Sequence, residues 1–186
     1  MNRNGRWLAV IASAAAAGLL AGLWQGGHFS PPSLARADAA APPALQPGHP
    51  LPDTLTLHGL DGLPLPLAAW RGRPLLINVW ASWCAPCVEE MPELAAFARQ
   101  QGDNGTRVVG LALDAPEAVE AFLARVPVPY VIAIEPPGPA DSSVALGNSA
   151  GLLPYTVLID ADGRLVKRKL GPFAHGEIGG WARQGN

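Results

Sequence analysis

The feature that most constrains the fold is an apolar run that leads into two closely spaced cysteines. Residues 75–80 (LLINVW) form a nearly continuous apolar segment, the pattern typical of a central strand covered on both faces. Three residues further on the chain reads Cys84-Ala85-Pro86-Cys87, and apolar residues then recur at helical spacing. Proline suits the first turn of a helix, where its missing N–H costs no hydrogen bond. The sequence therefore predicts that both cysteines lie where a buried strand meets a helix.

The remaining patterns alternate between strand and helix, which predicts an α/β fold with parallel neighbouring strands. A closing pair of strands joined by a short turn predicts an antiparallel hairpin, so the sheet is expected to be mixed. Strands are predicted at residues 53–57, 63–67, 75–80, 106–113, 130–134, 155–159 and 164–170, and helices at 67–70, 86–101, 116–125 and 174–183.

The N-terminal residues have the pattern of a targeting signal. Arg3 and Arg6 precede residues 7–24, a run that holds only apolar residues, glycine and serine. About 20 such residues span a bilayer, and the arginines favour an inside N-terminus. We expect residues 1–29 to be a signal anchor that leaves the following domain outside. The alternative is a cleaved signal peptide, because residues 35–37 (Ala-Arg-Ala) offer a cleavage site, although far beyond the apolar run.

Composition bounds the rest of the chain. Residues 30–50 are rich in proline and alanine and read as an extended linker, which leaves residues 51–186 as a single folded domain. The formal net charge is only -2, without a block of like charge, so nucleic-acid binding is not expected. The two cysteines lie too close in sequence to staple distant segments, and their use must be local.

The position of the cysteines predicts thiol chemistry. A thiol at a helix N-terminus has a lowered pKa because the helix dipole and free N–H groups favour the thiolate. Cys84 is therefore the predicted nucleophile, and Cys87, one turn along, is the predicted resolving thiol of a redox disulfide. Cys84 would attack a substrate disulfide to form a mixed disulfide, and Cys87 would then release the reduced product. The reverse sequence of steps oxidises a dithiol.

Three other uses of the cysteine pair compete with this one. A zinc half-site lacks further ligands, since no second CxxC or HxxxH motif exists, and no metal is expected. Two inert buried cysteines fit poorly with a strand-to-helix junction followed by proline. A site that carries Cu(I) between the two thiolates stays open.

Further motifs carry a family resemblance. Residues 79–87 (VWASWCAPC), 89–92 (EEMP) and 153–160 (LPYTVLID) occur in this order on the predicted elements. With them the chain resembles the TlpA/ResA-like thioredoxin family from about residue 51 to the C-terminus. The resemblance implies a thioredoxin-like fold, a central mixed sheet flanked by helices, and a thiol-disulfide oxidoreductase that needs no cofactor.

The resemblance also implies a place and a set of partners. Its members work outside the bacterial cytoplasmic membrane, which corresponds to a periplasmic or extracytoplasmic catalytic domain here. Their usual task is to reduce disulfides of exported proteins, as in cytochrome c maturation or copper-centre assembly, with electrons from a membrane thiol partner. The Ala-Pro pair between the cysteines constrains the direction only loosely, so a periplasmic dithiol oxidase and a Cu(I) metallochaperone are the alternatives.

Substrate contacts follow from the same resemblance. Pro154 corresponds to a proline with a cis peptide bond, which leaves the backbone of Leu153 free to pair with an extended substrate. The alternative is a trans proline that starts a strand. Trp83, Ala85 and Pro86 complete the expected substrate-binding surface.

One position departs from thioredoxin itself. Where thioredoxin has a buried aspartate that helps to deprotonate the resolving thiol, this chain has Asn78, which cannot accept a proton. Glu90 lies three residues after Cys87 on the same helix face and is the candidate proton acceptor. The alternative is a solvated first-turn glutamate that complements the helix dipole, the role that we expect for Glu89. Trp80 is expected either to shield the disulfide or to be simple core.

Overall fold

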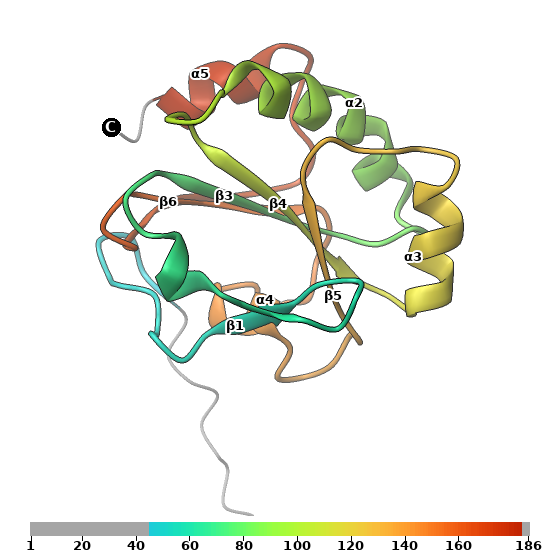
Figure 1. Ribbon diagram of the computed structural model, residues 1–186, viewed down its shortest axis with the longest axis horizontal. Coiled ribbons are helices and arrows are strands. Elements are labelled where there is room, and N and C mark those ends of the chain that lie inside the picture. Colours follow the sequence, from blue (N-terminus) through green and yellow to red (C-terminus); the bar gives the residue numbers. More distant parts are fainter. Residues whose placement is uncertain (1–44, 184–186) are drawn as a thin grey trace, which may run out of the picture. The chain divides into compact units, whose positions relative to one another are not determined.

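The computed structural model describes residues 45–183, which contain a five-stranded sheet with helices on both faces (Figure 1). The strands are β1 (Thr56–His58), β2 (Pro64–Pro66), β3 (Leu75–Trp80), β4 (Arg107–Leu113), β5 (Val131–Glu135), β6 (Tyr155–Ile159) and β7 (Leu165–Leu170). The helices are the 3-10 helix η1 (Leu67–Trp70), α2 (Ala85–Gln100), α3 (Pro116–Leu123), α4 (Ser142–Ala145) and α5 (Glu177–Arg183). The predicted anchor, residues 1–29, and most of the predicted linker lie outside the described residues. Within residues 45–183 no helix is long and apolar enough to cross a membrane.

The sheet is mixed, in the order β5-β4-β3-β6-β7. Strand β3 pairs parallel with β4, and β4 pairs parallel with β5, as the alternating pattern predicts. Strands β6 and β7 form the antiparallel hairpin that closes the sheet beside β3. The prediction of an α/β fold with a central mixed sheet is confirmed. Because β3 is the central strand, its carboxyl end delivers the cysteines to the middle of the sheet edge.

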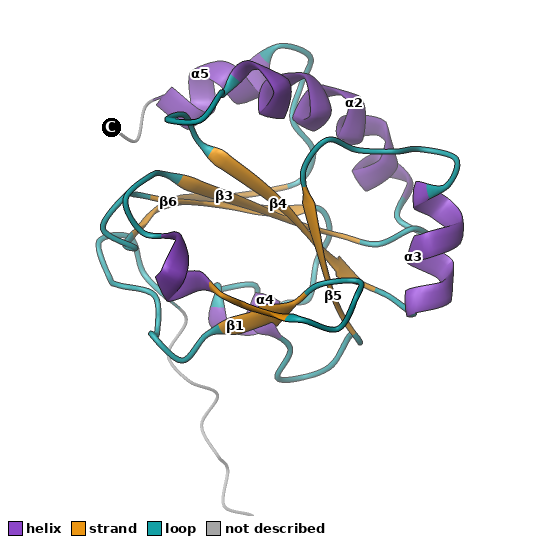
Figure 2. Ribbon diagram, viewed as in Figure 1, coloured by secondary structure: helices purple, strands orange, loops and turns teal. Residues whose placement is uncertain are grey.

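Alternation along β3 divides the core into two faces. Leu75, Ile77 and Val79 pack in the cluster that lies toward the β1–β2 hairpin and α4. Leu76 and Trp80 point the other way, toward the face covered by α2, α3 and α5 (Figure 2). All six residues of β3 are buried. The apolar run therefore has the two-sided burial that its composition predicts.

Two local features add to the predicted elements. Helix α4 was not among the predictions; it has only four residues and is capped by Asp141, whose side chain accepts from the Ser143 N–H. The last residues of the predicted linker, 45–50, are bonded to the domain. Gly48 N–H donates to Leu165 O at 2.7 Å, and Leu165 N–H donates to His49 O at 2.9 Å. Residues 48 and 49, which lead into the domain, are therefore held against the start of β7 by backbone hydrogen bonds.

Candidate active site

The two cysteines are joined at the start of α2. Cys84 is the N-cap residue of this helix, with an extended backbone, and the Cys84–Cys87 disulfide spans one turn with a Cα–Cα distance of 5.3 Å. Cys84 is 6% exposed, whereas Cys87 is fully buried at 0%. Pro86 occupies the first turn, where its missing N–H is not needed. Cys84 is therefore the more accessible of the two cysteines.

The two tryptophans near the cysteines have different environments. Trp83 is 69% exposed, and the neighbouring Ala85 and Pro86 are exposed as well. Trp80 is completely buried in the cluster that also contains both cysteines, and its ring lies 5.3 Å from that of Phe122. Of the two readings of Trp80, core is the one that the structure supports. Trp83, Ala85 and Pro86 form an accessible surface beside Cys84.

Leu153 and Pro154 border the same site. The peptide bond between them is cis, the form that the resemblance implies, and Pro154 is buried. Leu153 packs against the cluster that contains the cysteines. In the part of the chain that the structure describes, neither the N–H nor the C=O of Leu153 has a hydrogen-bond partner. Both groups are available to the backbone of an extended substrate.

Glu90 is bound inside the core rather than solvated. Its side chain is 2% exposed, and the amide of Asn78 donates to Glu90 Oε1 at 2.7 Å. The same amide donates to Thr156 Oγ1 at 3.0 Å, and the backbone N–H of Phe173 donates to Glu90 Oε2 at 2.9 Å. The reading of Glu90 as a solvated helix-terminal glutamate is therefore wrong. Its carboxylate lies against the side chain of Asn78, the position of the thioredoxin aspartate.

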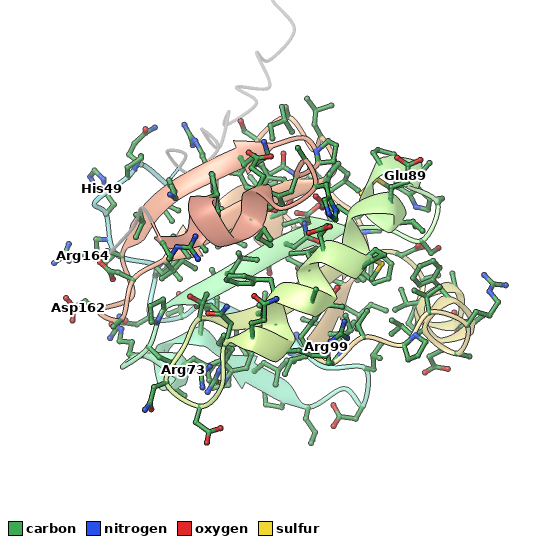
Figure 3. All side chains as sticks on the ribbon, turned by 90° about the horizontal axis from the view of Figure 1, so that it is seen from above. His49, Arg73, Glu89, Arg99, Asp162 and Arg164 are labelled. Atoms are coloured by element: carbon green, nitrogen blue, oxygen red, sulfur yellow. A yellow bond between two sulfur atoms is a disulfide. The ribbon has the colours of Figure 1, made fainter. Side chains whose placement is uncertain are left out.

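Burial controls the acidity of this carboxyl. Burial raises the pKa of Glu90 above its ordinary 4.5, although hydrogen bonds from Phe173 and Asn78 and the positive charge of Lys169 act in the opposite direction. Glu89, by contrast, is exposed near the start of α2, as Figure 3 shows. The two adjacent glutamates thus occupy different environments, and the burial that raises the pKa of Glu90 makes it the better candidate for a proton acceptor.

A residue that the sequence did not single out completes the site. Asp114, just after β4, accepts hydrogen bonds from the N–H and hydroxyl of Ser82 at 2.9 and 2.6 Å. Burial raises the pKa of Asp114, but these bonds and one from the Ala115 N–H outweigh it and hold the pKa below its ordinary value. Asp114 is therefore ionised at neutral pH, in direct contact with the turn that precedes Cys84.

Comparison with known proteins identifies the family. The pattern of the Redoxin family matches residues 46–179, which is most of the chain. This chain belongs to the Redoxin family. Among curated relatives, the thiol-disulfide oxidoreductase ResA of Bacillus cereus is 27% identical over 126 residues, 67% of this chain and 70% of that protein. The thiol:disulfide interchange protein DsbE of Allochromatium vinosum is 35% identical over 104 residues, 55% of this chain and 54% of that protein.

Solved structures agree with this assignment. A thioredoxin-related protein from Neisseria meningitidis serogroup B is similar to this redoxin with a TM-score of 0.62 and 27% identity, over 69% of this chain and 97% of that one. The predicted thioredoxin-like fold and the resemblance to the TlpA/ResA-like family are confirmed. This redoxin is a thiol-disulfide oxidoreductase, and its Cys84–Cys87 pair has the spacing that this chemistry requires.

The raised pKa of Glu90 predicts a pH-dependent stability. Because the folded state holds this proton more tightly than the unfolded chain, the stability that Glu90 contributes is fully present below about pH 4.5 and is lost as pH rises through the folded-state pKa. Each unit of pKa difference corresponds to about 1.4 kcal/mol. Glu90→Gln cannot titrate, so its free energy of unfolding should increase relative to that of the wild type as pH rises above about 4.5. Urea denaturation at several pH values measures the difference.

The substitution is compatible with the hydrogen bonds around residue 90. If the amide of Asn78 turns over, a glutamine can donate to Asn78 Oδ1 and still accept from the Phe173 N–H. Lys169, Glu177 and Tyr130 also interact electrostatically with Glu90, but they are the same in both proteins. Glu89→Gln is the matched control, since its side chain is exposed. Parallel pH curves for wild type and Glu90→Gln would refute the prediction.

Proposed function

We propose that this redoxin reduces disulfides in exported proteins, with Cys84 as nucleophile and Cys87 as resolving thiol. The observation that carries the assignment is the unequal exposure of the two sulfur-bearing residues at the N-terminus of α2. Cys84 retains access to solvent, whereas Cys87 has none. An intermolecular attack needs an accessible sulfur, and the internal attack that follows does not.

The proposed reaction moves two electrons from the enzyme to the substrate. The Cys84 thiolate attacks one sulfur of a substrate disulfide, and the other substrate sulfur leaves as a thiolate and takes up a proton. Cys87 then loses its proton and attacks the Cys84 sulfur, which forms the Cys84–Cys87 disulfide and expels the second substrate thiolate. Glu90, one turn past Cys87 and raised in pKa, accepts the Cys87 proton in this scheme. Substrate and enzyme exchange oxidation states, so the atoms and electrons balance.

The surface around Cys84 supports an extended polypeptide substrate. Trp83 offers an exposed aromatic face, and Ala85 and Pro86 leave the approach to Cys84 open. Opposite them, the unpaired backbone groups of Leu153 can form a short antiparallel pairing with the substrate chain, as in strand addition. Pro154 holds this segment against the site.

The proposed setting is the outer side of a bacterial cytoplasmic membrane. Arg3, Arg6 and the apolar run of residues 7–24 support an N-terminal anchor with the catalytic domain in the periplasm. A membrane thiol partner would then reduce the Cys84–Cys87 disulfide after each turnover. Cytochrome c maturation and copper-centre assembly are the reductive tasks that fit this setting.

The reduction potential of the Cys84–Cys87 pair tests the direction of electron flow. The full chain, equilibrated in thiol buffers of known potential, can be followed by tryptophan fluorescence because Trp83 adjoins Cys84. We expect a value near or below that of thioredoxin, about -270 mV. A value near that of DsbA, about -120 mV, would instead identify an oxidant and would overturn the proposal.

A further inference from the structure

The turn that leads into Cys84 is fastened to the neighbouring strand. Residues 81–84 form a turn closed by the Cys84 N–H, which donates to Ala81 O at 3.1 Å. Ser82 lies inside this turn, and both its N–H and its hydroxyl donate to Asp114 Oδ2, at 2.9 and 2.6 Å. Asp114 is 9% exposed. A carboxylate from another strand thus holds the backbone two residues before the nucleophilic cysteine.

The register of the sheet makes this contact possible. Trp80 of β3 pairs with Ala112 of β4 in the parallel ladder, and Ser82 and Asp114 each lie two residues after this pair, just beyond the ends of the two strands. The carboxyl ends of parallel strands meet at one edge of the sheet, where this fold keeps its cysteines. The contact is therefore part of the framework of the site.

The charge of Asp114 has hydrogen-bond donors but no cation to balance it. Within residues 45–183 no lysine, arginine or histidine nitrogen lies within 4 Å of this carboxylate. Its partners are the two donors of Ser82 and the N–H of Ala115, all of them neutral groups. A full negative charge is consequently held beside the turn that precedes Cys84.

This charge acts against the Cys84 thiolate. Ser82 lies two positions before Cys84 and bonds directly to Asp114, so the carboxylate lies within about 10 Å of the cysteine. A nearby like charge disfavours a thiolate, whereas the N-terminus of α2 favours it. Disulfide carriers whose reduced form is strongly stabilised, such as DsbA, are oxidants. A carboxylate that makes the reduced form less stable shifts the pair in the opposite direction, toward a reductant.

We propose that Asp114, held by Ser82, is a positioning residue that fixes the turn before Cys84 and lowers the reduction potential of the Cys84–Cys87 pair. The inference rests on the proposed role of Cys84 as nucleophile. It assigns the reducing character of this redoxin to a contact between two strand ends, outside the CxxC motif itself.

The test compares Asp114→Asn with a matched control elsewhere in the domain. Asp141 makes the same type of contact, a carboxylate that accepts from the N–H and hydroxyl of Ser143, and it is 8% exposed. The full chain of each variant is equilibrated with glutathione buffers. We expect Asp114→Asn to favour the reduced form about threefold more than the wild type, which corresponds to about 14 mV. Asp141→Asn should equal the wild type.

A second pair of variants keeps the test decisive if Asp114→Asn does not fold. Ser82→Ala removes the hydroxyl donor, and Ser82→Thr retains it. Ser82→Ala keeps the charge of Asp114 but removes one of the two bonds that hold the turn, so we expect it to react more slowly with a substrate disulfide, and Ser82→Thr to behave as the wild type. Alkylation of the reduced proteins as a function of pH should show Cys84 reacting at lower pH in Asp114→Asn.

Two results would overturn the inference. One is an equal shift of the glutathione equilibrium in Asp114→Asn and Asp141→Asn, which would show that Asp114 has no specific effect on the cysteine pair. The other is an equal rate of reaction with a substrate disulfide for Ser82→Ala and Ser82→Thr, which would show that the contact does not position the turn before Cys84. A wild-type potential near that of DsbA would refute the proposed reductive function but would leave the difference between Asp114→Asn and wild type intact, so the two failures are distinguishable.

Discussion

Replacing Cys84 by serine should abolish disulfide reduction, a loss on the order of 10³-fold or more. A hydroxyl is a poor nucleophile at neutral pH and cannot form the mixed disulfide that the reaction passes through. Reduction of insulin disulfides with dithiothreitol as electron donor measures the rate. Circular dichroism and a thermal melt, compared with the reduced wild type, show whether the fold is retained.

Replacing Cys87 by serine should give a different defect. Cys84 can still attack a substrate disulfide, but the mixed disulfide can no longer be resolved internally, so the covalent complex should accumulate. Non-reducing electrophoresis and intact mass measurement detect this species, and dithiothreitol releases it. A covalent complex formed by Cys84→Ser in place of Cys87→Ser would exchange the two roles and contradict the exposure argument.

Trp80→Ala should be among the most destabilising substitutions in the domain, at about 3–5 kcal/mol. The indole is completely buried against Phe122 and in the cluster that holds both cysteines, so its removal leaves a large cavity beneath the active site. Folded domains are stable by only about 5–15 kcal/mol, and this loss removes much of that margin. Chemical denaturation of the oxidised protein measures it.

Trp80→Phe separates the packing of this side chain from its polar atom. Within the described residues the buried indole Nε1 has no hydrogen-bond partner, which costs about 1–3 kcal/mol. Phenylalanine removes that N–H together with some volume, so the net loss should stay below about 1 kcal/mol. Trp83→Phe, at an exposed position, is the control and should change stability by less than about 0.5 kcal/mol. A Trp80→Phe loss close to that of Trp80→Ala would contradict the unpartnered N–H.

Sequence reasoning found the parts of this fold that depend on local pattern. The apolar run at residues 75–80 coincides with β3, and the order of strands and helices follows from periodicity alone. Helix α4 was not predicted because a helix of four residues is too short to show a periodic pattern. Its capping residue, Asp141, is also a common turn residue, so it did not indicate a helix. Element type was therefore predictable wherever an element was long enough to repeat its pattern.

The candidate site was only partly predictable, because several of its contacts join distant segments. Glu90 could be singled out by its spacing from Cys87. One of its two hydrogen-bond partners, however, is the backbone N–H of Phe173, and a backbone contact between distant segments leaves no pattern in the sequence. The contact between Asp114 and Ser82 crosses 32 residues and depends on the register of two strands. Such pairs become visible only when the sheet is assembled.

The attachment of residues 45–51 to β7 has a mechanical consequence. Gly48 and Leu51 are bonded to Leu165 and Gly163, and the Arg164 side chain donates to Gly48 O at 3.0 Å. Tension applied to the N-terminal segment would be borne first by these bonds at the edge of the sheet. Two strands, β7 and β6, lie between that edge and β3. The bonds that take up this tension therefore lie at the far side of β6 and β7 from β3, the strand that leads to the turn before Cys84.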